Sequence, residues 1–92
     1  MGVALDRLTA GLAPATLLAE VQRAWPDAAG EAVAGQSEPV AERAGVITVA
    51  CRSAVWAQEL DLLSERVVER LNAALGRPAV RGLRPQARPP AR

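Results

Sequence analysis

The longest unbroken helical pattern of hydrophobic and polar positions runs from Cys51 to Gly76. Hydrophobic residues recur there every three or four positions, which aligns them on one face of a helix; they are Trp56, Leu60, Leu63, Val67, Leu71 and Leu75. Ser53 is a suitable N-cap, and Gly76 followed by Pro78 is a suitable end. The pattern predicts one continuous helix whose apolar face belongs to the core, with Trp56 as its anchor; the alternative is a groove for a partner.

A second helical pattern lies upstream of it. It starts at Pro14, a favourable first helical residue, and has an amphipathic face made of Leu17, Leu18, Val21 and Trp25. Pro26 lacks a backbone N–H, so we predict a kink there or two helices in line, with an exit at residues 35–37. Residues 1–13 have leucines at near-helical spacing but also Gly11, which predicts a weakly ordered segment.

Two short segments with β-branched residues and alternating polarity predict strands. Val46 to Cys51 alternates apolar and more polar positions, as in a sheet covered on one side. The turn at residues 43–45 lets Val40 and Ala41 pair back as an antiparallel partner. Residues 78–84 predict a weaker third strand, with Val80 facing the helices.

The element order is therefore one or two helices, two strands, a helix and a strand. This order predicts an α+β fold in which a small three-stranded sheet packs on helices in two layers. The domain is expected to span residues 14–84, and the Arg- and Pro-rich residues 85–92 are expected to be a disordered tail. The predicted core comprises Trp25, Ile47, Val49, Trp56, Leu60, Leu63, Val67 and Leu71.

Composition argues against catalysis and cofactor binding. The chain has one cysteine, Cys51, and no histidine, so an internal disulfide, a usual zinc site and His-based catalysis are not expected. Neither Ser37 nor Ser53 has a His partner, and no Gly-rich phosphate loop occurs. We expect Cys51 to be an inert apolar residue on the covered face of the sheet.

Acidic residues on the long helix allow two interpretations. Asp61, Glu65 and Glu69 are spaced by four residues, which would suit a metal clamp, but such a run is usually a solvated helix face. No segment approaches the roughly 18 apolar residues that a bilayer span requires, so we expect no membrane association and a cytoplasmic protein.

The charge distribution is asymmetric. Residues 1–65 carry a net charge of −5 and residues 66–92 carry +6. This asymmetry favours an anionic partner for the C-terminal part, although a solvated Arg- and Pro-rich tail would also explain it. The candidate phosphate contacts are Arg52, Arg77, Arg81, Arg84 and Arg88. Because Phe and Tyr are absent and both tryptophans are predicted to be buried, such binding would be directed to the nucleic-acid backbone.

Several short motifs together resemble one bacterial family. They are Trp25-x-x-x-x-Gly30, Ser37-x-Pro39, Gly45-Val-Ile47-x-Val49, Ser53-x-x-Trp56-x-x-Glu59-Leu60, Leu71-Asn72-x-x-Leu75-Gly76 and Val80-x-x-Leu83. Over about residues 17–84 the chain resembles the DciA family. The resemblance implies a KH-like fold and a factor that interacts with the replicative DNA helicase DnaB and assists its loading onto DNA. The GxxG loop of RNA-binding KH domains is absent, so the usual KH groove is not carried over.

Two functions follow as expectations. The first is a non-enzymatic adaptor whose partners are a DnaB-type helicase and, weakly and electrostatically, single-stranded DNA. The alternative is a KH-like RNA- or nucleic-acid-binding module that is unrelated to the helicase.

Overall fold

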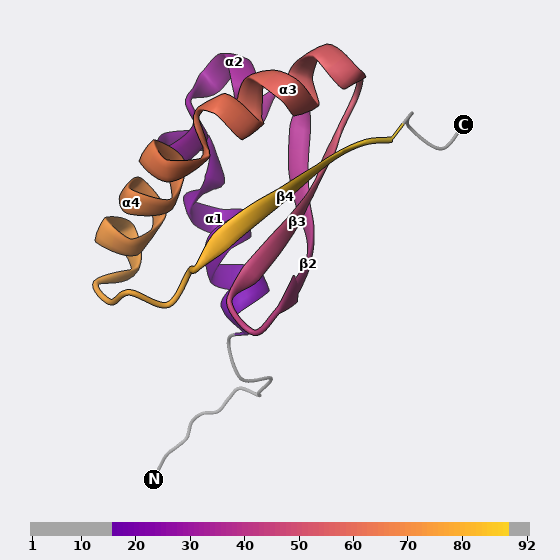
Figure 1. Cartoon of the computed structure of the whole chain (residues 1–92). Helices are drawn as coiled ribbons and strands as arrows, with labels where there is room; N and C mark the ends of the chain where they lie inside the picture. Colours follow the sequence, from indigo (N-terminus) through magenta and orange to yellow (C-terminus); the bar gives the residue numbers. More distant parts are fainter. Residues whose placement is uncertain (1–15, 89–92) are drawn as a thin grey trace, which may run out of the picture.

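A three-stranded sheet with helices against it makes up residues 16–88, the part of the chain that the computed structural model describes (Figure 1). The elements are α1 (Leu17–Ala29), α2 (Glu31–Ala34), β2 (Ser37–Arg43), β3 (Val46–Cys51), α3 (Ala54–Leu62), α4 (Ser64–Leu75) and β4 (Gly82–Ala87). The strand order is β2-β3-β4, with β2 antiparallel and β4 parallel to β3. The predicted α+β class is confirmed, and the arrangement is compatible with a KH-like two-layer fold.

The predicted hairpin is present, and its turn has only two residues. Ala44 and Gly45 both have positive φ, 52° and 85°, as the tight turns that match strand twist require. The Gly45 N–H donates to Glu42 Oε2 at 2.9 Å. A Cβ at Gly45 would lie 2.8 Å from Arg81 Cγ and 2.9 Å from the Ala79 carbonyl oxygen, so only glycine fits. The predicted partner strand was too short, because pairing continues to Arg43.

The N-terminal helical region breaks later than predicted. Helix α1 starts at Leu17, where the Thr16 side chain caps it by accepting from the Ala19 N–H at 3.0 Å. Pro26 lies inside α1, and the chain turns at Gly30, whose φ of 91° is easily adopted only by glycine. The expectations for residues 1–13 and for Pro14 lie outside the described residues.

The prediction of a single helix from residue 51 to 76 is wrong, because Leu63 separates two helices. Its ψ of 2° takes it out of the helical region, while its N–H still bonds the carbonyls of Glu59 and Leu60. Helix α3 packs against β3 and β4, whereas α4 packs mainly against α1. A straight helix could not reach both surfaces, so the bend at Leu63 serves the packing. The predicted ends are confirmed, with Ser53 capping α3 and Gly76 ending α4.

The third strand lies further along the chain than predicted. It covers Gly82–Ala87, so the expectation of a disordered tail is wrong for residues 85–87, and residues 89–92 lie outside the described part. Pro85 is tolerated because β4 is an edge strand, paired with β3 alone among the described strands. Val80 precedes the strand and is buried. The Asn72 side chain holds it, donating to the Val80 carbonyl at 3.0 Å and accepting from its N–H at 2.8 Å.

The core lies between the sheet and the helices. Its buried hydrophobic residues are Val21, Trp25, Ala28, Ala29, Val33, Ile47, Val49, Cys51, Leu60, Val67, Leu71 and Val80. Trp25 is 3% exposed, and its Nε1–H donates to Ser37 Oγ at 3.2 Å. Trp56 and Leu63 are only partly buried at the edge of this cluster. Both tryptophans were predicted in the core: Trp25 is buried there, whereas Trp56, the predicted anchor of the apolar face of the long helix, is only partly buried.

Candidate nucleic-acid interface

One face of the sheet is left open by the helices (Figure 1). Residues alternate between the two faces of a strand. Ile47, Val49 and Cys51 point to the core, so Val46, Thr48 and Ala50, which are half-buried, form the middle of the open face. The described helices pack against the opposite face. The open face is thus a part of the sheet that a ligand could reach.

Arginines surround this open face. The register places Arg43 opposite Val46 and Arg84 opposite Thr48, and both arginines are exposed. At the end of the sheet, the Arg88 N–H donates to the Cys51 carbonyl at 2.7 Å. The Arg52 N–H likewise donates to the Gln36 carbonyl at 2.9 Å. These backbone bonds fix the positions from which the Arg52 and Arg88 side chains extend, and both residues are exposed.

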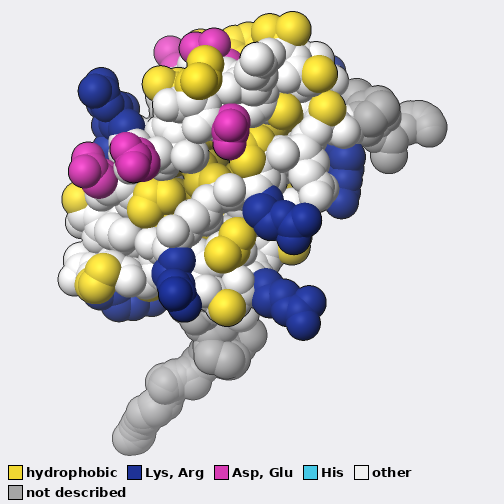
Figure 2. Space-filling view, in the orientation of Figure 1, with side chains coloured by type: hydrophobic (Ala, Val, Ile, Leu, Met, Phe, Trp, Pro, Cys, Tyr) yellow, Lys and Arg dark blue, Asp and Glu magenta, His cyan; other side chains and the backbone are white. Residues whose placement is uncertain are grey.

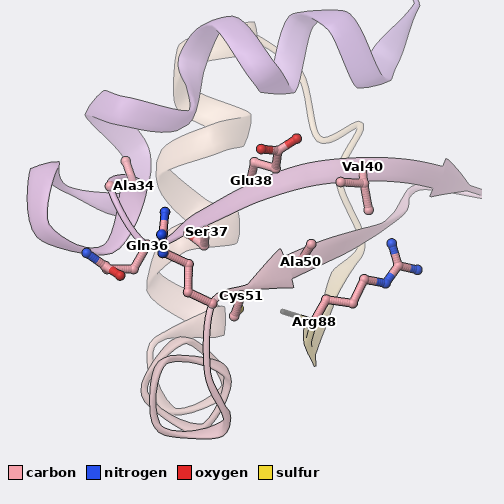
Figure 3. A pocket seen from close by; sticks show the side chains of 10 residues that line it. Ala34, Gln36, Ser37, Glu38, Val40, Ala50, Cys51 and Arg88 are labelled. Carbon is pink, nitrogen blue, oxygen red and sulfur yellow. The ribbon is translucent and has the colours of Figure 1, made fainter. Parts of the chain in front are cut away.

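A hollow of about 390 Å³ lies at this end of the sheet. Its lining comprises Ala34, Gly35, Gln36, Ser37, Glu38, Val40, Ala50, Cys51, Arg52 and Arg88. In Figure 3 the Arg88 side chain extends beside Ala50 and Val40, and the turn before β2 closes the other side. Two guanidinium groups, balanced by the single carboxylate of Glu38, give the hollow a basic character. Such a site suits an anionic group such as a phosphate.

Two of the five arginines predicted as phosphate contacts lie elsewhere. Arg77 forms a bidentate pair with Glu20, with nitrogen–oxygen distances of 3.1 and 2.8 Å. The hydrogen bonds from Arg77 lower the pKa of the Glu20 carboxyl. Arg81 lines a hollow together with Glu65 and Glu69 of α4. Glu20 therefore offsets the charge of Arg77, whereas Arg52, Arg84 and Arg88 lie along the open face.

Arg43 was not among the predicted site residues. The sequence pattern could have identified Arg43. With a turn of two residues, Arg43 pairs with Val46, whose side chain lies on the open face. That signal was lost by assigning residues 43–45 to the turn.

The side chains considered for catalysis have structural roles. Ser37 Oγ donates to the Val33 carbonyl at 2.6 Å, and Ser53 caps α3. Cys51 is 1% exposed, and burial raises the pKa of its thiol. Asp61 lies on α3, whereas Glu65 and Glu69 lie on α4. Within residues 16–88, no group of three or more His, Cys, Asp or Glu side chains could hold a metal ion.

Arginines predominate over the strands, although Arg66 and Arg70 lie among the acids of α4. Figure 2 shows arginine side chains over the strands and the connection before β4, and acidic side chains over α3 and α4. Over residues 16–88, no helix has the length and apolar character needed to cross a membrane.

These features define a small two-layer α+β domain with an open, basic sheet face. The chain belongs to the DciA family: the family model described as "Dna[CI] antecedent, DciA" matches residues 1–84. This membership confirms the resemblance drawn from the short motifs.

Two curated relatives are similar to this chain. A UPF0232 protein of Streptomyces avermitilis is 37% identical over 90 residues, which cover 94% of this chain and 50% of that protein. A UPF0232 protein of Rhodococcus jostii is 32% identical over 60 residues, which cover 65% of this chain and 32% of that protein. The chain thus spans half or less of the length of these relatives.

Proposed function

We propose that this protein is a non-enzymatic adaptor that binds a replicative helicase of the DnaB type and assists its loading onto DNA. The observation that supports this proposal is membership of the DciA family over residues 1–84. The structural roles of Ser37, Ser53 and the buried Cys51 agree with a function that needs no nucleophile.

The second part of the proposal is weak binding of single-stranded DNA at the open sheet face. Arg43, Arg52, Arg84 and Arg88 supply planar guanidinium groups that bond phosphate oxygens well. Trp25 is buried, Trp56 lies on α3, and the chain has no Phe or Tyr, so the open face offers no aromatic ring for base stacking. Binding would therefore follow the phosphate backbone with little sequence preference.

The adaptor role is tested by gel filtration of the purified chain with the DnaB-type helicase of its own organism. We expect the two proteins to elute together in one peak. Separate elution at micromolar concentrations would contradict the adaptor role. If the chain then bound single-stranded RNA more tightly than DNA of the same sequence, the KH-like RNA-binding alternative would replace it.

DNA binding is tested by the salt dependence of affinity for a fluorescent oligo-dT strand. Each phosphate contact on a single strand contributes a slope of about −0.7 in log K against log salt. Three or four contacts should therefore weaken binding about twenty- to fifty-fold between roughly 50 and 200 mM salt. The double variant Arg84→Ala, Arg88→Ala should reduce the slope by about 1.4.

A matched control removes the same charge from the helix layer. Arg66 and Arg70 are exposed on α4, so the double variant Arg66→Ala, Arg70→Ala should keep the slope of the unaltered chain. Equal slopes for the two double variants would remove the open face from the proposal, and undetectable DNA binding at low salt would remove the DNA-binding role.

A further inference from the structure

The outer face of α3 exposes two large hydrophobic side chains. Val55 is 73% and Leu62 is 78% exposed, and they are the exposed large hydrophobic residues of the part of the chain that the structure describes. They lie seven residues apart, which is two helical turns or about 10 Å along the same face. Single exposed hydrophobic residues are common, but an aligned pair on one helix forms a patch.

Packing of the core does not explain why Val55 and Leu62 are hydrophobic. The inner face of α3 already buries Leu60, and Trp56 and Ala57 pack partly against the core. A surface helix normally has a polar outer face opposite such an inner face. In α3 the outer face presents Val55 and Leu62 beside the polar Gln58 and Glu59, so this helix carries hydrophobic side chains on its outer side as well.

Acidic side chains border the apolar pair. Glu59 lies between Val55 and Leu62 on the helix surface, and Asp61 and Glu65 follow close by; all three acids are exposed. Arg52, three residues before Val55, and Arg66, four residues after Leu62, are exposed as well, so acids outnumber arginines around the pair by three to two. Figure 2 shows hydrophobic side chains over α3 with acidic side chains beside them, away from the arginines of the strands. Because like charges repel, this surface disfavours nucleic acid and favours a partner with basic residues.

A second copy of the chain fits this surface poorly. In a two-fold symmetric dimer the same patch would face itself. Glu59, Asp61 and Glu65 would then oppose their own copies, which costs free energy. The charges therefore point to a different protein as the occupant.

We propose that the outer face of α3, with Val55 and Leu62 as apolar anchors and Glu59, Asp61 and Glu65 as a rim, is the surface that docks onto the replicative helicase. The matching helicase surface is an apolar hollow bordered by Lys or Arg. This inference rests on the proposed adaptor function and adds the contact surface to it. Of the candidate phosphate contacts, Arg52 lies three residues before Val55, whereas Arg43, Arg84 and Arg88 lie on or beside the strands, so a helicase on α3 leaves these three arginines free for a DNA strand.

The first test replaces the apolar anchors. The double variant Val55→Thr, Leu62→Gln changes only exposed positions, so its far-UV circular dichroism and melting temperature should match those of the unaltered chain. Its affinity for the helicase of the same organism, measured by calorimetry, should fall about tenfold or more, as for central anchors of an interface. The control Ala73→Gln, at an exposed position of α4, should retain full affinity.

The outcomes separate the two proposals. If the unaltered chain binds the helicase and the anchor variant binds equally well, the docking surface is refuted and the adaptor role stands. If the unaltered chain does not bind the helicase, the adaptor role and the docking surface are both refuted. If the chain alone forms dimers that Leu62→Gln dissolves, a second copy occupies this face and the helicase assignment is refuted.

The second test replaces the acidic rim. The double variant Glu59→Gln, Glu65→Gln should associate with the helicase more slowly, and its association rate should depend less on salt. The control Asp27→Asn, Glu31→Gln removes two exposed acids from α1 and α2. Equal rates and salt dependences for both variants would overturn charge complementarity as the basis of docking.

Discussion

The two tryptophans differ in what their removal would cost. Trp25 is 3% exposed and donates its indole N–H to Ser37, whereas Trp56 lies only partly buried at the edge of the core. We expect Trp25→Ala to lower the free energy of unfolding by about 3–5 kcal/mol, and Trp56→Ala to lower it by clearly less. Urea denaturation of the two variants checks this order. A larger loss for Trp56→Ala would show that the core is centred on α3 rather than on α1.

Single residues also show how far the sequence alone could locate the candidate site. Arg84 and Arg88 were expected from the charge split along the chain, and Arg52 from the alternation of apolar and polar positions in β3. The pairing of Arg77 could not be foreseen, because its partner Glu20 lies 57 residues away in the sequence and no local pattern links the two. Counter-ions of this kind depend on tertiary packing, which a charge count along the chain does not contain.

At the scale of the elements, local chemistry was predictable and long-range packing was not. The hairpin follows from β-branched residues around a turn that ends in Gly45, and the helix ends at Ser53 and Gly76 follow from capping preferences. The break at Leu63 has no comparable local signal, because the apolar spacing continues across it. It results from the different surfaces that α3 and α4 must reach.

The position of β4 was missed for a related reason. Gly82 and Pro85 disfavour a strand locally. The strand forms because β3 offers an open side to pair with, and because Asn72 holds Val80 just before the strand begins. Pairing with a distant strand thus outweighs the local preference.

At the scale of the whole molecule, the Glu20–Arg77 pair ties α1 to the segment after α4. Hydrogen bonds from Arg77 hold the pKa of Glu20 below its usual value. The pair therefore stabilises the fold above the usual Glu pKa of about 4.3, and this contribution is lost as the pH falls through the lowered pKa of the folded state. We expect Glu20→Gln to lower the melting temperature at pH 7, with a difference that shrinks as the pH falls below about 4.

The control for this prediction is Glu31→Gln, which removes an exposed acid from α2. Its melting temperature should follow that of the unaltered chain more closely at pH 7. A difference between Glu20→Gln and the unaltered chain that stayed constant from pH 7 to pH 3 would show that the pair contributes nothing through ionisation.

The two pairs of neighbouring strands in the sheet are connected by chain segments of very different length. Strands β2 and β3 are linked by Ala44 and Gly45, whereas residues 52–81 separate β3 from β4. Closing the longer connection costs more chain entropy, so the hairpin should assemble before β4 docks. In native-state hydrogen exchange we expect the amide of Arg88, bonded to the Cys51 carbonyl, to open at lower denaturant than the hairpin amides. If the Arg88 amide and the hairpin amides opened at the same denaturant concentration, the sheet would unfold as one unit. If β4 opens first, the basic end of the open face is the last part of the sheet to form and the first to be lost.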